Sequence, residues 1–306
     1  MRQKTVWAKA LVSLLMVVVM TAGVFCAYSR SHPPVALGQE AGSATGKETP
    51  ERIVVTSMAT AYIMEKLDLQ VVGVPDSQVD PLPDRYRGVT SVGAPMQPDQ
   101  EVLSALHPDW VISPASLIGD LKPIYEKLNL TYGFINLNTV PGMYQSISDL
   151  GRLFNRQQEA AALVADYDRF MADYRQRHPE GSGKKVLILM GLPGSYVVAT
   201  DQSYVGSLVK LAGGENVYPD ASQPFLNVNV EDMLKKDPDL IFCTAHALPD
   251  EVMAMFHEEF QTNPNWKHFR AVKEGRVYDL NHNRFGMSAK FNYPEALSDL
   301  EGYLYA

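Results

Sequence analysis

Residues 143–178 are the stretch that most restricts what this chain can fold into. They contain no proline and a single glycine, Gly151, and apolar side chains recur at close to the 3.6-residue helical period. The stretch starts after a Pro-Gly pair and ends at Pro179. It therefore predicts one helix of roughly 50 Å, at 1.5 Å per residue. Such a helix fits either the surface of one domain or a connection between two, and the sequence on both sides favours the second.

Strand-like and helix-like segments alternate on both sides of this helix. Before it, ERIVVTS at residues 51–57 is typical of a strand, and the next segment has a helical pattern with Thr56 or Ser57 as N-cap. After it, KVLILM is typical of a strand buried on both faces, and Ser203 is positioned to cap a helix over residues 204–211. Alternation with short loops predicts parallel βα units.

The two halves share one pattern at an offset of 130 residues. EVLSALHPDWVI from Glu101 aligns with EDMLKKDPDLIF from Glu231, each giving an acidic helix start, a helix, a Pro-Asp turn and an apolar strand. The prediction is an α/β protein with two α/β lobes joined by one long helix. The predicted parts are residues 1–28, a signal peptide or membrane anchor; 29–50, a flexible tether; 51–142, the N-terminal lobe; 143–178, the bridging helix; and 179–306, the C-terminal lobe.

The first 28 residues predict export. Three basic residues precede an uncharged run over residues 10–28, and Cys26 is followed by a Ser/Gly-rich segment. This layout is typical of a lipoprotein, although Phe25 stands where lipoprotein signals have a small residue. The run is also long enough to span a bilayer uncleaved. We expect the protein at the outer face of the cytoplasmic membrane, anchored by lipid on Cys26 or by this segment.

Composition and motifs exclude several classes of function. The net charge is −8 and the basic residues are scattered, so no basic patch is available for nucleic acid. Cys243 has no partner in the body of the chain, so the fold is not a disulfide framework; it lies in the apolar run LIFCTA and is expected to be buried. GLPGSY at residues 191–196 matches neither a nucleophile elbow nor a P-loop, and we expect no enzyme activity.

A site for bare zinc or manganese ions needs three or four His, Asp or Glu ligands. Of the six histidines after residue 50, only His107 lies in the first half, directly before Pro108. That places it at the start of a strand, whereas ligand sites of open α/β sheets lie beyond the strands' carboxyl ends. A bare-ion site would therefore lack a histidine from the first lobe.

The two predicted lobes, the connecting helix and the E-x-x-x-x-L-x-P-D pattern from Glu101 resemble the substrate-binding proteins of iron, siderophore, cobalamin and haem importers. Five segments along residues 51–306 are similar, more narrowly, to haem-binding lipoproteins of the iron-regulated surface determinant type. They are VGAPMQPD at 92–99, VLILMGLPGSYVVAT at 186–200, DQSYVGSLVKLAGGENV at 201–217, AHALPDEV at 245–252 and NWKHFRAVKEGRVYDL at 265–280.

That resemblance implies a ligand in the cleft between the two lobes. It also implies a monomeric protein that takes one haem b per chain from cell-surface donor proteins and delivers it to an ABC permease. A siderophore- or cobalamin-binding protein of the same fold is the alternative, and a zinc- or manganese-binding protein is a weaker one. The residues it implies are Met96 and His246 as axial iron ligands, Met58, Ala59, Ser77 and Gln78 as further haem contacts, and Glu101 and Glu231 as permease-docking residues.

The chemistry of these residues can be weighed separately. Met96 and His246 each follow a strand-like run, and a thioether with an imidazole is a known axial pair for haem iron. Met58 and Ala59 begin a helix, whose N–H groups suit a propionate carboxylate; ordinary helix packing is the other interpretation. Gln78 departs from the resembled family, in which an aromatic residue is expected.

Arg85 and Tyr86 lie near enough in sequence to reach a propionate. Their alternative interpretation is as exposed loop residues.

Overall fold

The computed structural model describes residues 36–37, 51–76, 80–219 and 222–306. The predicted export segment, Cys26, most of the tether, and Ser77 and Gln78 lie outside these residues. The described residues from Leu37 to Ala306 form one compact unit that contains two large sheets.

The first large sheet is parallel wherever its pairing is defined and has the order β1-β8-β7-β2-β3-β4. From β2 the chain proceeds outward to β3 and β4, then returns to place β7 on the other side of β2. The direction of winding therefore reverses between β2 and β7, which is where doubly wound sheets bind ligands. The strands are β1 (Ala36–Leu37), β2 (Ile53–Val55), β3 (Gly73–Val74), β4 (Thr90–Ser91), β7 (Trp110–Pro114) and β8 (Tyr132–Ile135). The associated helices are α2 (Met58–Lys66), the 3₁₀ turns η1 (Asp84–Tyr86) and η2 (Ala115–Leu117), α3 (Gln100–Ala105), α4 (Ile118–Lys127) and α5 (Val140–Leu153).

The second large sheet has the order β12-β10-β9-β13-β14, with β11 also paired to β9. β9, β11, β13 and β14 are parallel, whereas β10 and β12 run antiparallel to their neighbours. The strands are β9 (Lys185–Leu192), β10 (Ser195–Ala199), β11 (Glu215–Asn216), β12 (Phe225–Leu226), β13 (Leu240–Ala245) and β14 (Val277–Asp279). The associated helices are α7 (Tyr204–Leu211), α8 (Val230–Lys235), α9 (Pro249–Thr262), η3 (Trp266–His268), α10 (Arg270–Lys273) and α11 (Tyr293–Leu304).

Local sequence signals account for several of these elements. The Ser57 hydroxyl accepts the N–H of Thr60 and caps α2, which confirms one of the two predicted caps. Ser203 caps α7 at Gly206, and that helix has the predicted bounds. The interior of β9 is fully buried, as its continuous apolar run predicts. Cys243 is buried in β13, also as predicted.

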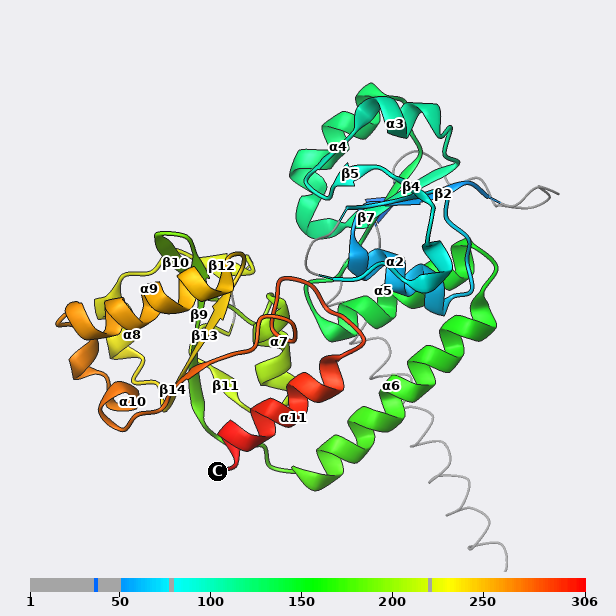
Figure 1. Cartoon of the computed structure of the whole chain (residues 1–306). Helices are drawn as coiled ribbons and strands as arrows, with labels where there is room; N and C mark the ends of the chain where they lie inside the picture. Colours follow the sequence, from blue (N-terminus) through cyan, green and yellow to red (C-terminus); the bar gives the residue numbers. More distant parts are fainter. Residues whose placement is uncertain (1–35, 38–50, 77–79, 220–221) are drawn as a thin grey trace, which may run out of the picture. The chain divides into compact units, whose positions relative to one another are not determined.

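The prediction of one unbroken helix over residues 143–178 is wrong. The segment forms α5 and then α6 (Gln157–Arg177), with a break in which Asn155 has φ 55°. Asparagine tolerates this left-handed conformation and often ends helices in it. A Cβ on Gly151 would lie 2.5 Å from the Cβ of Ala160, so the glycine lets α6 approach α5 closely. The long helix that leads from the first sheet to the second is therefore α6, of 21 residues and about 32 Å (Figure 1).

The repeat at an offset of 130 residues extends to the backbone. α3 and α8 each have six residues, and each is capped by a side chain two residues before the aligned glutamate, Asp99 and Asn229. Each repeat also has a residue with positive φ before its Pro-Asp turn: His107 at 43° and Asp237 at 45°. The alignment thus reflects one structural unit used twice.

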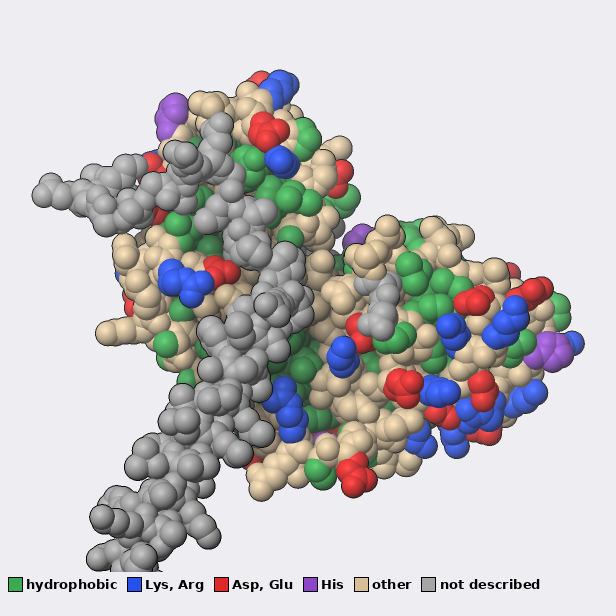
Figure 2. All heavy atoms as spheres, turned by 180° about the vertical axis from the view of Figure 1, so that it is seen from behind, with side chains coloured by type: hydrophobic (Ala, Val, Ile, Leu, Met, Phe, Trp, Pro, Cys, Tyr) green, Lys and Arg blue, Asp and Glu red, His purple; other side chains and the backbone are tan. Residues whose placement is uncertain are grey.

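The surface carries charges of both signs. Figure 2 shows Lys and Arg side chains interspersed with Asp and Glu on the face that it displays. Among the described helices, none has the length and apolar character needed to cross a membrane.

Candidate ligand-binding site

The predicted site residues that the structure describes lie at or near the carboxyl ends of parallel strands or at the starts of helices that precede such strands. Met58 and Ala59 follow β2, and His246 follows β13. Met96 follows β4 after the intervening strand β5 (Gly93–Ala94). In open α/β sheets this edge is where ligands bind.

The start of α2 offers backbone groups and not side chains. Met58 and Ala59 are only 6% and 8% exposed, so their side chains belong to the core. Among described groups, nothing accepts a hydrogen bond from either of their N–H groups. Two free N–H groups at the positive end of a helix suit an anionic oxygen.

A chain of buried hydroxyls braces the strand ends beneath α2. Thr56 Oγ1 lies 2.7 Å from Ser113 Oγ, which lies 2.8 Å from the hydroxyl of Tyr125. Burial raises the pKa of Tyr125, so it remains protonated and can donate. These bonds join β2, β7 and α4 at the point where the winding direction reverses, and so fix the edge on which α2 begins.

Met96 lies at the tip of a two-residue hairpin. β5 pairs with β6 (Gln97–Pro98) in an antiparallel register, leaving Pro95 and Met96 as the turn. Gly93 has φ 85° at the base of the hairpin, a conformation natural to glycine. The side chain of Met96 is 57% exposed, which is unusual for a methionine.

The hairpin is tied to the loop that contains the other predicted contacts. The N–H of Asp76 donates to the carbonyl of Gly93 at 2.9 Å, and the Ser91 hydroxyl donates to the Asp76 carboxylate. Ser77 follows directly, but Ser77 and Gln78 lie outside the described residues. Their predicted contacts with haem remain predictions.

His246 is held by its backbone, and its ring is accessible. Its N–H donates to the carbonyl of Gly191 at 3.0 Å, which extends the pairing of β13 with β9 by one residue. A Cβ on Gly191 would lie 2.2 Å from Val252, so glycine is required for α9 to pack over β9. The side chain of His246 is exposed and has no hydrogen-bond partner among the described residues. An imidazole in this state is available as a ligand.

Glu101 and Glu231 occupy the second helical position of α3 and α8. Both are exposed, and neither carboxylate has a hydrogen bond or ion pair with a described group. Because α3 and α8 each lead into a parallel strand, their N-termini lie at the same edge of each sheet as the candidate ligands. In the first lobe, Met96 and Glu101 are only five residues apart.

Arg85 and Tyr86 make contacts that stabilise the fold. The Arg85 guanidinium pairs with Asp68 at 2.5 Å, and the hydroxyl of Tyr86 donates to the carbonyl of Leu69 at 2.8 Å. Tyr86 is fully buried, so its interpretation as an exposed loop residue is wrong. Its aromatic ring packs in the hydrophobic core, where burial raises the pKa of its hydroxyl.

The structure also exposes two large apolar side chains that sequence reasoning did not select. Ile118 is 37% exposed at the start of α4, and Leu248 is 54% exposed just before α9. Nothing in their local sequence distinguishes them from core residues.

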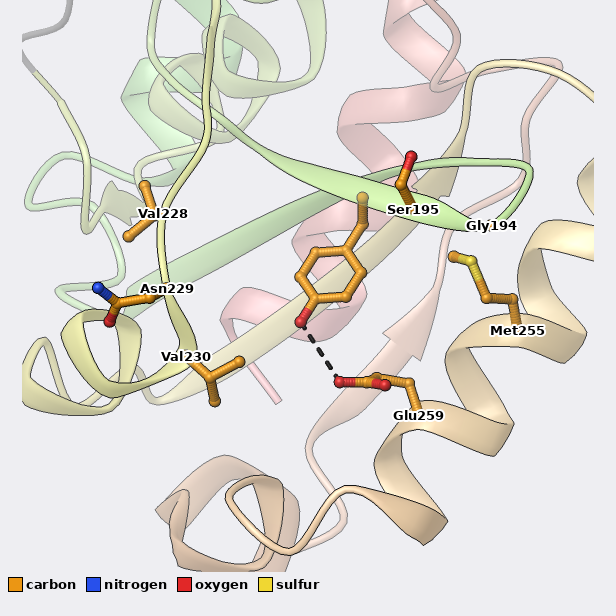
Figure 3. A pocket seen from close by; sticks show the side chains of 8 residues that line it. Gly194, Ser195, Val228, Asn229, Val230, Met255 and Glu259 are labelled. Atoms are coloured by element: carbon orange, nitrogen blue, oxygen red, sulfur yellow. Dashed lines mark hydrogen bonds between the residues drawn. The ribbon is translucent and has the colours of Figure 1, made fainter.

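A separate cavity of about 470 Å³ lies between β10, α8 and α9 (Figure 3). Its lining includes Tyr196, Val230 and Glu259, and none of the predicted ligand contacts. The Glu259 carboxylate accepts from Tyr196 at 3.4 Å and from the Trp266 indole at 3.0 Å. Burial, together with this carboxylate, raises the pKa of Tyr196 to about 12. In the described part of the chain, no three His, Cys, Asp or Glu side chains converge as a metal-ion site would require.

Two α/β sheets linked by a long helix, with potential ligands at the carboxyl-end edges of both, define a substrate-binding protein of the type that serves membrane transporters. The chain belongs to the periplasmic binding protein family, whose model matches residues 53–283.

Individual relatives agree with that assignment. The chain is 41% identical over 260 residues to the high-affinity heme uptake system protein IsdE of Staphylococcus aureus, covering 83% of this chain and 87% of that protein. The crystal structure of S. aureus IsdE complexed with heme matches with a TM-score of 0.79 and 39% identity, over 84% of this chain and all of that one. An ABC transporter substrate-binding protein from Listeria monocytogenes matches with a TM-score of 0.80 and 45% identity, over 84% of this chain and 99% of that one. The chain is thus homologous to a haem uptake protein.

Proposed function

We propose that this protein is an extracytoplasmic haem-binding protein that delivers haem to an ABC permease and performs no catalysis itself. The carrying observation is the pair of exposed, unpartnered side chains, Met96 and His246, at the carboxyl-end edges of two different sheets. The homology to IsdE supports haem as the ligand.

The chemistry of the available residues fits one haem b per chain. Methionine sulfur and histidine nitrogen are a known axial pair for haem iron, and each side chain is exposed on a backbone held by hydrogen bonds. A ligand from each lobe would grip a flat macrocycle on both faces. The free N–H groups of Met58 and Ala59 would receive a propionate carboxylate. Ser77 and Gln78 would add contacts from the loop after β3.

Docking to the permease is assigned to Glu101 and Glu231. One exposed carboxylate per lobe, in equivalent positions of a repeated unit, gives a partner two matching points of contact. Paired charges of this kind chiefly set orientation and specificity. A helix dipole also favours an acidic residue at these positions.

We place the protein at the outer face of the cytoplasmic membrane, anchored by lipid on Cys26 or by the uncleaved N-terminal segment. It would work as a monomer and receive haem from cell-surface donor proteins.

Titration of the purified full-length chain with haemin tests the proposed ligand. A shifted Soret band that saturates at one haem per chain is the expected result. Cyanocobalamin and a ferric hydroxamate should not compete at equal concentration. An unchanged free-haem spectrum contradicts the proposal, and displacement by either competitor indicates the siderophore or cobalamin alternative.

A further inference from the structure

The described part of the chain has three large apolar side chains that are exposed: Met96, Ile118 and Leu248. All three lie at the edge of a sheet formed by the carboxyl ends of its parallel strands. Met96 has a proposed role as an iron ligand. Ile118 and Leu248 have none, although each lies at the carboxyl-end edge of its own sheet, where ligands of open α/β sheets bind.

Leu248 is distinguished by its backbone. Its φ and ψ are 46° and 61°, in the left-handed region. The other described non-glycine residues with positive φ are aspartate, asparagine or histidine, which adopt this region more readily. Leucine lacks the short polar side chain that eases the conformation, and Leu248 also precedes Pro249, which restricts its backbone further.

The surrounding structure enforces this conformation. Before Leu248, the N–H of His246 is bonded to Gly191 at 3.0 Å; after it, the N–H of Val252 is bonded to the carbonyl of Leu248 at 3.0 Å. Close packing of Val252 over Gly191 fixes the start of α9 against β9. Only a short turn connects the two fixed points, and it carries the leucine side chain outward. Strained residues held in this way gather at ligand-binding sites.

The side chain of Leu248 does not stabilise the helix that it precedes. Leu248 is the N-cap residue of α9, a position at which Ser, Thr, Asp or Asn would bond to the helix, and no side-chain cap bond is present. A strained, half-exposed leucine that makes no cap bond does not stabilise the folded protein. Its position two residues after His246 suggests instead that it contributes to ligand binding.

Ile118 has an equivalent position in the first lobe. It begins α4, directly after β7 and η2, next to the point where the winding direction reverses between β7 and β2. Its exposure of 37% is lower than that of Leu248.

We propose that Leu248, and secondarily Ile118, are apolar contacts for the haem macrocycle and determine selectivity for a large planar apolar ligand. This inference rests on the proposed haem-binding function. Burying a half-exposed leucine against a ligand should strengthen retention by about tenfold. The strain at Leu248 is then the cost of presenting an apolar side chain beside the histidine ligand.

The test compares two readouts on the purified full-length chain: the thermal midpoint without haem, and the rate of haem loss to apomyoglobin. Leu248→Asn removes the apolar contact and suits the left-handed backbone. It should raise the off-rate about tenfold while the midpoint stays equal or rises by up to ~3 °C. Leu248→Met should restore slow loss. Ile118→Gln should raise the off-rate about threefold.

Asn129→Gly is the matched control, because Asn129 is exposed and left-handed at φ 53° but follows the opposite end of α4. Its off-rate should equal that of the wild type. An unchanged off-rate in Leu248→Asn overturns the inference and leaves the proposed function intact. A faster off-rate with a lower midpoint assigns Leu248 to the framework and also overturns it. Absence of a Soret shift in the wild type overturns both proposals.

Discussion

The two lobes share a framework but present their candidate ligands on different kinds of turn. In the first lobe, Asp109 Oδ2 accepts the N–H of Arg52 at 2.9 Å; in the second, Asp239 Oδ2 accepts the N–H of Lys185 at 2.8 Å. Each bond ties the start of β7 or β13 to the strand beside it. These equivalent aspartates lie at the edge opposite to the site.

The differences lie at the other edge of each sheet. In the first lobe the candidate ligand precedes the repeated unit, on the β5–β6 hairpin before α3. In the second lobe it follows the unit, on the turn after β13. One helix–strand unit can therefore serve as a rigid support while the chain before or after it carries the candidate ligand.

The largest effect is expected on haem uptake by cells, when the exposed glutamate that begins the helix of each repeated unit is replaced. Glu101→Ala combined with Glu231→Ala should reduce haem uptake by cells that carry the cognate permease to background. Haem off-rates should stay within twofold of the wild type, because neither carboxylate has a described partner.

The matched control replaces exposed glutamates away from the repeated units, Glu126→Ala with Glu258→Ala, and should take up haem normally. Normal uptake by the Glu101 and Glu231 double variant would show that docking uses other residues.

The next largest effect is expected on the rate of haem loss, when the candidate ligands on the two different turns are replaced. His246→Ala should speed haem loss on the order of a hundredfold, since it removes the proposed nitrogen ligand of the iron. Met96→Ala should speed it about tenfold and leave a five-coordinate or water-ligated spectrum. Absorption spectra and transfer to apomyoglobin measure both. If the two variants keep the wild-type spectrum and off-rate, the iron ligands lie elsewhere.

A moderate effect on stability should come from the equivalent aspartates. Asp109→Ala and Asp239→Ala should each lower the free energy of unfolding by about 1–3 kcal/mol, because each leaves a backbone N–H without its carboxylate acceptor. Asp239 also pairs with Arg270 at 2.7 Å. Urea denaturation of the haem-free chain measures both, and an effect below about 0.5 kcal/mol in either variant contradicts the role of that aspartate.

The contribution of Asp239 should also depend on pH. Burial opposes ionisation, but the N–H of Lys185 and the Arg270 guanidinium together hold the pKa of Asp239 below its ordinary 3.8. A lowered pKa in the folded state stabilises the protein above the unfolded pKa, and this stabilisation is lost as the pH falls through the folded value. The stability difference between the wild type and Asp239→Asn should therefore be constant from pH 7 to 5 and shrink below about 3.8. A difference that grows toward acid would contradict this sign.

The smallest expected effect is the change that haem binding causes in the arrangement of the two lobes. One stiff helix is a poor hinge, and two further contacts join the segments: Ala289 N–H donates to Leu137 at 2.7 Å, and Lys290 Nζ lies 2.8 Å from Asp80. X-ray scattering of the chain with and without haem should give the same radius of gyration. A clear decrease on binding would mean that the lobes close.

Much of the fold could be predicted from local sequence signals. The caps at Ser57 and Ser203, the apolar strands and the repeated unit all act over a few residues, so their patterns can be read directly. The break at Asn155 was missed because the apolar periodicity continues across it on both sides. Its only signal was an asparagine followed by a new acidic helix start.

Less of the candidate site could be predicted from the sequence. Periodicity and spacing place Met96 and His246 near strand ends, but they do not reveal that one lies on a hairpin tip and the other is anchored to Gly191. The buried role of Tyr86 depends on a partner 17 residues away. The strain at Leu248 arises from packing between β9 and α9, which no local pattern records.

The placement of the aromatic residues has an optical consequence. The described chain holds two tryptophans, Trp110 in β7 and Trp266 in η3, so each sheet has one associated indole. Both are at least nine-tenths buried, Trp110 against Phe154 and Trp266 against Phe269. Each indole is therefore a fixed emitter whose fluorescence an absorbing porphyrin would quench according to its distance. Replacing Trp7 and one of the two by phenylalanine leaves a single emitter, and the protein then reports the arrival of a coloured ligand separately from each half.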